Sequence, residues 1–114
     1  MLPRIAWIQG LYYLVTGVWP IIHIQSFLIV TGPKVDLWLV KTVGVLIAVI
    51  GGVLLSASRA RRITDEIILL AAGSALGLAI IDAVYARHIS SVYLADAAAE
   101  LCLVAFWAVG RARA

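Results

Sequence analysis

The amino-acid sequence predicts an all-helical membrane protein, a bundle of four transmembrane helices. The 114 residues are 64% hydrophobic and only 13% charged, whereas soluble domains carry about 25% charged residues. Four apolar stretches each approach the roughly 20 residues that a helix needs to cross a bilayer. Helices satisfy their own backbone hydrogen bonds in lipid, and no alternating strand pattern is present. The expected spans of this single domain are about 5–28, 36–55, 63–85 and 92–110.

The first expected span contains a proline, Pro20, within its apolar run. Proline removes one helical hydrogen bond and kinks the chain. We therefore expect the first helix to kink there and to continue through His23. The run FLIV at 27–30 then forms either an ordinary helix end with a loop or a small lid over the mouth of the bundle.

Local signals define the limits of the other three spans. The stretch TGPKVD at 31–36 has the breakers of a turn. Asp65 and Glu66 suit the first turn of the third helix, where the helix dipole favours negative charge. In the same helix, Gly73 and Gly77 form a GxxxG pair, a pattern that lets membrane helices approach closely.

The basic residues predict an orientation. Membrane proteins keep lysine and arginine in cytoplasmic loops. We therefore expect both termini to be cytoplasmic, in a bacterial inner membrane. The opposite loops carry only Lys34 and Arg87. The arginines on the expected cytoplasmic side are Arg4, Arg59, Arg61, Arg62, Arg111 and Arg113.

Four ionisable side chains from three spans are expected to converge in the outer half of the bundle. At about 1.5 Å of rise per residue, Lys41, Asp82 and Asp96 lie roughly 7 Å below the outer helix ends, and Glu100 roughly 13 Å. A charge at the bilayer centre costs at least about 2.5–3.5 kcal/mol. We expect Lys41 to pair with one or two carboxylates and Glu100 to hold a proton. The residues expected to line this site further are Tyr85, Tyr93 and His23.

The expected site favours a binding or transport function. A small amphiphile, a lipid or a cation is the expected ligand, and a neutral or cationic one suits a site where carboxylates outnumber the lysine. One alternative is a structural subunit whose ion pairs only hold the helices together. Another is an enzyme that acts on a lipid-like substrate with Glu100 or Asp82 as acid or base; we expect binding rather than catalysis.

Other partners are mostly excluded by the sequence. The two histidines show no metal-ligand spacing, so we expect neither a metal nor another cofactor. The net charge of +3 comes from basic residues at loops and at the C-terminal end, so we expect no nucleic acid. Membrane lipid is the expected surrounding. A homodimer is a further option because four short helices enclose little volume.

Three segments resemble small four-helix bacterial inner-membrane proteins of the DoxX-like kind, which are largely uncharacterised. The segments are QGLYYLVTGVWPIIH (9–23), VTGPKVDLWLVKTVG (30–44) and IDAVYARHISSVYLADAAAE (81–100). The resemblance implies a four-helix fold and a bacterial inner membrane. It implies no reaction.

Overall fold

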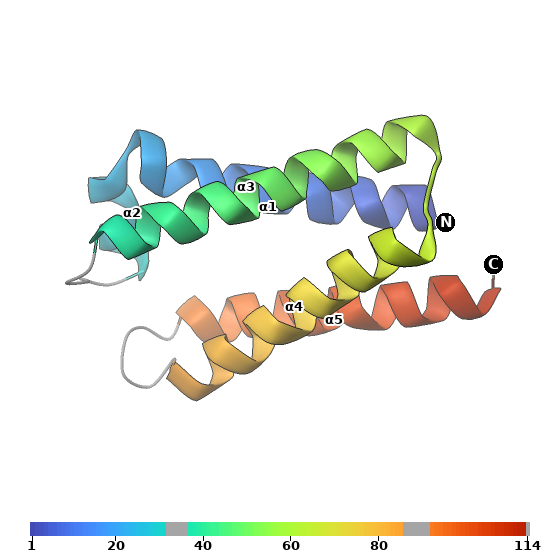
Figure 1. Ribbon diagram of the computed structural model, residues 1–114. Helices are drawn as coiled ribbons and strands as arrows, with labels where there is room; N and C mark the ends of the chain where they lie inside the picture. Colours follow the sequence, from blue (N-terminus) through green and yellow to red (C-terminus); the bar gives the residue numbers. More distant parts are fainter. Residues whose placement is uncertain (32–36, 86–91, 114) are drawn as a thin grey trace.

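The computed structural model describes residues 1–31, 37–85 and 92–113, and its elements are all helices. The four long helices are apolar enough to cross a membrane, which confirms the predicted helical architecture with four candidate spans. Both termini lie at one end of the bundle, which we call the terminal end (Figure 1). The helices are α1 (Leu2–Ile22), α2 (Ile24–Thr31), α3 (Leu37–Ala60), α4 (Asp65–Tyr85) and α5 (Val92–Arg113).

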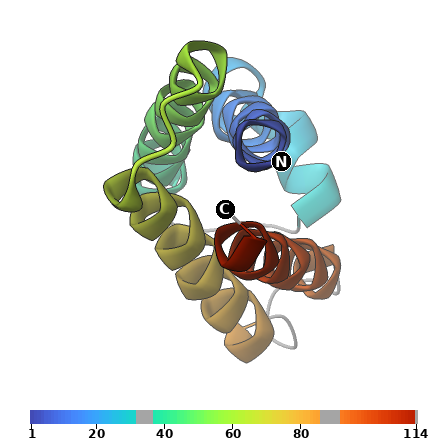
Figure 2. The same ribbon diagram turned by 90° about the vertical axis from the view of Figure 1, so that its right-hand side faces the viewer.

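The long helices form two pairs. Helix α1 packs along α3, and α4 packs along α5, whereas contacts between the two pairs are sparser. The view along the bundle shows the pairs on opposite sides, with α2 beside α1 (Figure 2). The molecule is therefore built from two tightly packed helix pairs that make fewer contacts with each other.

Glycines set the contact between α1 and α3. Gly17 lies against Gly44, and Gly10 lies against Gly51. A Cβ atom added to Gly17 would come within 2.5 Å of the Gly44 carbonyl oxygen, and one added to Gly51 within 2.6 Å of the Gly10 oxygen. Within α1 the two glycines are seven residues apart, and the same holds within α3. Two successive contacts therefore hold the antiparallel helices backbone to backbone.

The expected GxxxG pair behaves differently. Gly73 and Gly77 are exposed, and a Cβ atom added to either would meet no atom within 4 Å. Two small residues at GxxxG spacing occur on any face of a helix, and only a facing helix makes them a contact. In the described part of the chain, the close approach is made by the glycines of α1 and α3 instead.

The first span ends earlier than expected. Helix α1 contains Pro20 but stops at Ile22, and His23 leaves the helical conformation with φ −142° and ψ 79°. The Nδ1 atom of His23 accepts a hydrogen bond of 3.2 Å from the backbone N–H of Ser26. His23 thus caps the start of α2, because this N–H is one that a new helix leaves unpaired. The FLIV run lies in the separate short helix α2.

The terminal end is charged. Asp65 and Glu66 occupy the first turn of α4, as predicted, and Arg111 lies in the last turn of α5. Arg111 forms an exposed salt bridge of 3.5 Å with Asp65. Exposed pairs of this kind contribute about 0–1 kcal/mol, so the bridge marks where the two helix ends meet more than it stabilises them.

Candidate functional site

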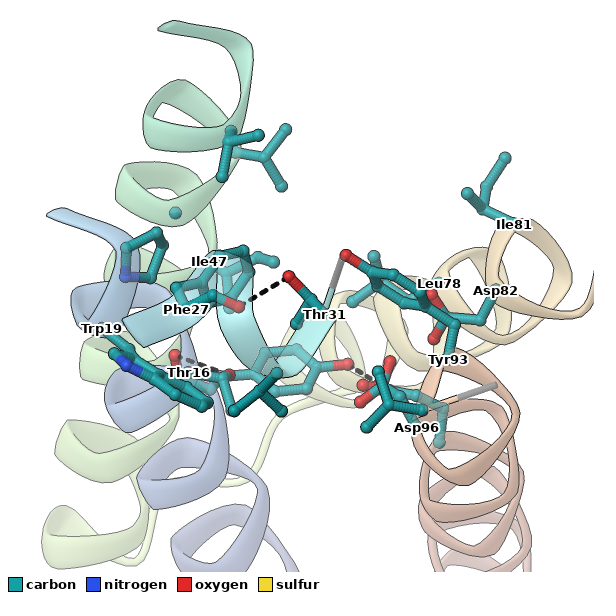
Figure 3. A pocket seen from close by; sticks show the side chains of 18 of the residues that line it. Thr16, Trp19, Phe27, Thr31, Ile47, Leu78, Ile81, Asp82, Tyr93 and Asp96 are labelled. Carbon is teal, nitrogen blue, oxygen red and sulfur yellow. Dashed lines mark hydrogen bonds between the residues drawn. The ribbon is translucent and has the colours of Figure 1, made fainter. Parts of the chain in front are cut away.

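A cavity of about 730 Å³ lies between the two helix pairs, in the half of the bundle away from the termini. Small-molecule sites typically measure about 300–1,000 Å³ and are mostly apolar with a few placed polar groups. Residues of all five helices line this cavity (Figure 3). Its apolar and aromatic lining includes Trp19, Pro20, Phe27, Val30, Val43, Ile47, Leu78, Ile81 and Tyr93.

Three carboxyl groups lie on the α4–α5 side of this cavity. Asp82 comes from α4, and Asp96 and Glu100 come from successive turns of α5. Asp82 is 7% exposed and Glu100 is 1% exposed, while Asp96 is half-buried. The structure thus brings these three acids, of the four ionisable residues expected to converge, to one cavity. We call them the acidic cluster.

Two tyrosines of α1 face the acidic cluster. The Tyr13 hydroxyl donates a hydrogen bond of 2.6 Å to Oε2 of Glu100. The Tyr12 hydroxyl donates to Oδ1 of Asp96. The two rings belong to adjacent residues but are tilted by 49°, so each reaches a different carboxyl group. These bonds connect one helix pair to the other.

The sequence prediction did not include Tyr12 and Tyr13 in the site. A signal for them exists, because both lie near Gln9 and Thr16 on a loosely polar side of the first span. Tyrosine is also common at membrane interfaces, so its presence in a span does not by itself indicate a site. Only the hydrogen bonds to the carboxyl groups of α5 distinguish a tyrosine of the site from a tyrosine at the membrane interface.

Asp82 differs from the other two acids. Its Oδ2 atom is buried and has no hydrogen-bond partner among the described residues. Its carboxyl group as a whole lies within hydrogen-bond reach of the Asp96 carboxyl group and within electrostatic reach of Glu100. A buried acceptor without a donor costs about 1–3 kcal/mol. Because Asp82 lines the cavity (Figure 3), its Oδ2 atom is available to accept a hydrogen bond from a bound ligand.

A packed core lies next to the cavity, toward the terminal end. Gln9 is fully buried, and its Nε2 donates to the Ala71 carbonyl oxygen at 2.9 Å. Its Oε1 accepts a 2.6 Å hydrogen bond from the indole N–H of Trp107. This triad joins α1, α4 and α5 within a core that includes Ile5 and Leu54. The packed core therefore separates the cavity from the terminal end.

The remaining predicted residues are distributed differently. Tyr93 lines the cavity. Lys41 is exposed on α3 and is not among the residues that line the cavity, so the structure does not bring it to the acidic cluster. His23 is also exposed, and its ring bonds to Ser26. Tyr85 ends α4, and its side chain lies outside the described part of the chain.

The chemistry of the site follows from these groups. Carboxyl oxygens accept hydrogen bonds from N–H or O–H donors and attract cations. The surrounding aromatic and aliphatic walls favour an apolar partner. Within the described residues, no group of three or more histidine, cysteine, aspartate or glutamate side chains is placed to hold a metal ion. The arrangement suits a molecule with one polar and one apolar end.

Comparisons with known proteins add no relative. No model of a known protein family matches the chain, and neither do curated proteins or solved structures.

Proposed function

We propose that this protein binds a small amphiphile in the cavity between its two helix pairs. The observation that carries the proposal is the buried Oδ2 atom of Asp82, which has no hydrogen-bond partner among the described residues and lies at a large apolar cavity. The carboxyl groups would hold the polar end of the ligand. The apolar tail would lie along side chains such as Ile47 and Leu78, where removing apolar area from water contributes about 25 cal/mol per Å².

We further propose a placement in a bacterial inner membrane with cytoplasmic termini. The arginines of the terminal end, such as Arg111 and Arg113, support this orientation through the positive-inside rule. The cavity would then lie in the outer half of the membrane. Transport of the ligand, in addition to binding, would require the contacts among Gln9, Ala71 and Trp107 to open, because they belong to the packed core between the cavity and the terminal end.

A cavity-filling variant tests the binding proposal. Leu78 lines the cavity, whereas Leu69 of the same helix is 74% exposed. We expect Leu78→Trp to abolish the binding of dodecyl amphiphiles, measured by native mass spectrometry from a neutral maltoside detergent. Leu69→Trp is the matched control and should bind like the wild type. Absence of binding for every head group, or equal binding by both variants, would refute the proposal.

A structural role is the second candidate, and the bonds from Tyr12 and Tyr13 to the acidic cluster favour it. These bonds would fix how the helix pairs meet without any ligand. The two roles differ at Asp82, whose Oδ2 bonds to no described residue. If Asp82→Asn lowers ligand binding but leaves thermal stability in detergent unchanged, binding is supported. If it changes stability alone, the structural role is supported.

A further inference from the structure

We propose that the ligand is a protonated alkylamine whose ammonium N–H donates to Oδ2 of Asp82. This assignment rests on the proposed amphiphile-binding function and specifies the class of head group. Three features of the cavity lead to it: its charge, its hydrogen-bond balance and its aromatic wall.

The charge of the cavity favours a cation. The three acids of the cluster line it, and the described residues of its lining include no lysine, arginine or histidine. Lys41 and His23, two basic residues that the structure describes, are exposed and outside the lining. A carboxylate in a medium of low dielectric constant needs a positive partner close by. An ammonium group supplies that charge, whereas an anionic head group would be repelled.

The hydrogen-bond balance favours a head group that keeps an N–H. Glu100 and Asp96 each accept one bond from a tyrosine hydroxyl of α1. Asp82 is buried to more than nine-tenths, and its Oδ2 accepts none within the described residues. A primary, secondary or tertiary ammonium carries at least one N–H and can satisfy this atom. A quaternary ammonium carries the same charge without a donor, so the two head groups can be told apart.

The wall opposite the acidic cluster is aromatic. The Trp19 and Phe27 rings pack edge to face, with centroids 5.4 Å apart, and both line the cavity. The Trp19 indole N–H donates to the Ser26 hydroxyl at 2.8 Å, which fixes α2 against α1. Aromatic rings attract cations and also accept apolar chains. An alkylamine offers both, since its charged nitrogen is joined directly to a hydrocarbon.

The experiment compares four dodecyl probes on the full chain in maltoside detergent: dimethyldodecylamine, dodecyltrimethylammonium, dodecanol and dodecanoate. At pH 7 the free amine is protonated, as a lysine side chain is. By titration calorimetry we expect the tertiary amine to bind at least about tenfold more tightly than the alcohol and the quaternary ammonium, because a charge-assisted hydrogen bond is among the strong ones. Dodecanoate should bind most weakly.

Asp82→Asn should weaken the affinity for the tertiary amine by at least about tenfold and leave the affinity for dodecanol unchanged. Asp65→Asn is the matched control, because Asp65 lies exposed at the other end of α4. If the Asn variant fails to fold, the comparison of the four probes on the wild-type chain still tests whether the head group is a protonated amine.

Two outcomes would overturn the assignment. Equal affinity for amine and alcohol would refute the cationic head group, and equal affinity for the tertiary and quaternary ammonium would refute the N–H donor. Either result leaves the amphiphile-binding function standing if Leu78→Trp still abolishes binding. Failure of all four probes to bind would instead remove the proposed function itself.

Discussion

The hydroxyl of Tyr13 and the carboxyl group of Glu100 meet in a 2.6 Å hydrogen bond, and both side chains are 1% exposed. The bond joins α1 of one helix pair to α5 of the other. Tyr13 thus supplies a hydrogen-bond donor to Glu100, the most buried acid of the cavity.

Tyr13→Phe should therefore destabilise the protein. The variant leaves a buried carboxyl oxygen without its donor, which costs about 1–3 kcal/mol. Unfolding in mixed detergent micelles measures the change. In the double variant with Glu100→Ala the two losses should not add, because both remove one bond. Full additivity would show that the bond contributes nothing.

The glycine contact between α1 and α3 predicts a second effect. Gly44→Ala places a methyl group within 2.6 Å of the Gly17 carbonyl oxygen, so the helices must separate. Overpacking of this kind costs about 1–3 kcal/mol. Gly73→Ala is the control on α4, where the added methyl meets no atom within 4 Å. There we expect no loss, since alanine is the better helix former by up to about 1 kcal/mol.

Gln9→Leu should be more harmful than Tyr13→Phe. It removes the donor to the Ala71 carbonyl group and the acceptor of the Trp107 indole N–H together. Two buried polar groups then lack partners, and each costs about 1–3 kcal/mol. The thermal midpoint in detergent reports the loss. A smaller effect than that of Tyr13→Phe would show that the triad is not a main tie between the helices.

Binding of the alkylamine should depend on pH. Protons and the ammonium group compete for the same carboxylates, so affinity should fall as pH is lowered. Among the described residues, the titratable groups that line the site are Asp82 from α4, Tyr93, Asp96 and Glu100 from α5, and the two tyrosines of α1. Calorimetry over a pH series measures the trend for dimethyldodecylamine, with dodecanol as the probe that should show none. An affinity for the amine that does not change with pH would contradict the competition.

The acids of the site could be predicted from the sequence, but their partners could not. Asp82, Asp96 and Glu100 interrupt apolar spans, and polar groups in a span turn toward protein. Lys41 shares a helical stripe with Gly44 and Gly51, yet those glycines pack on α1 while the lysine stays exposed. A stripe on a helix is wide, and its edge can face lipid while its centre faces a neighbour.

The sequence by itself determined the four apolar helices, because their length and composition satisfy the backbone in lipid without help from the rest of the chain. It also determined the spacing of the acids along their helices, because rise per residue is constant along a helix. Only the tertiary structure decided which helices pair, through the close approach of Gly17 to Gly44 and of Gly10 to Gly51. The tertiary packing also turned Tyr12 and Tyr13 toward α5 and left the Oδ2 atom of Asp82 without a donor among the described residues. Such packing depends on contacts between segments distant in the chain, which periodicity within one segment does not encode.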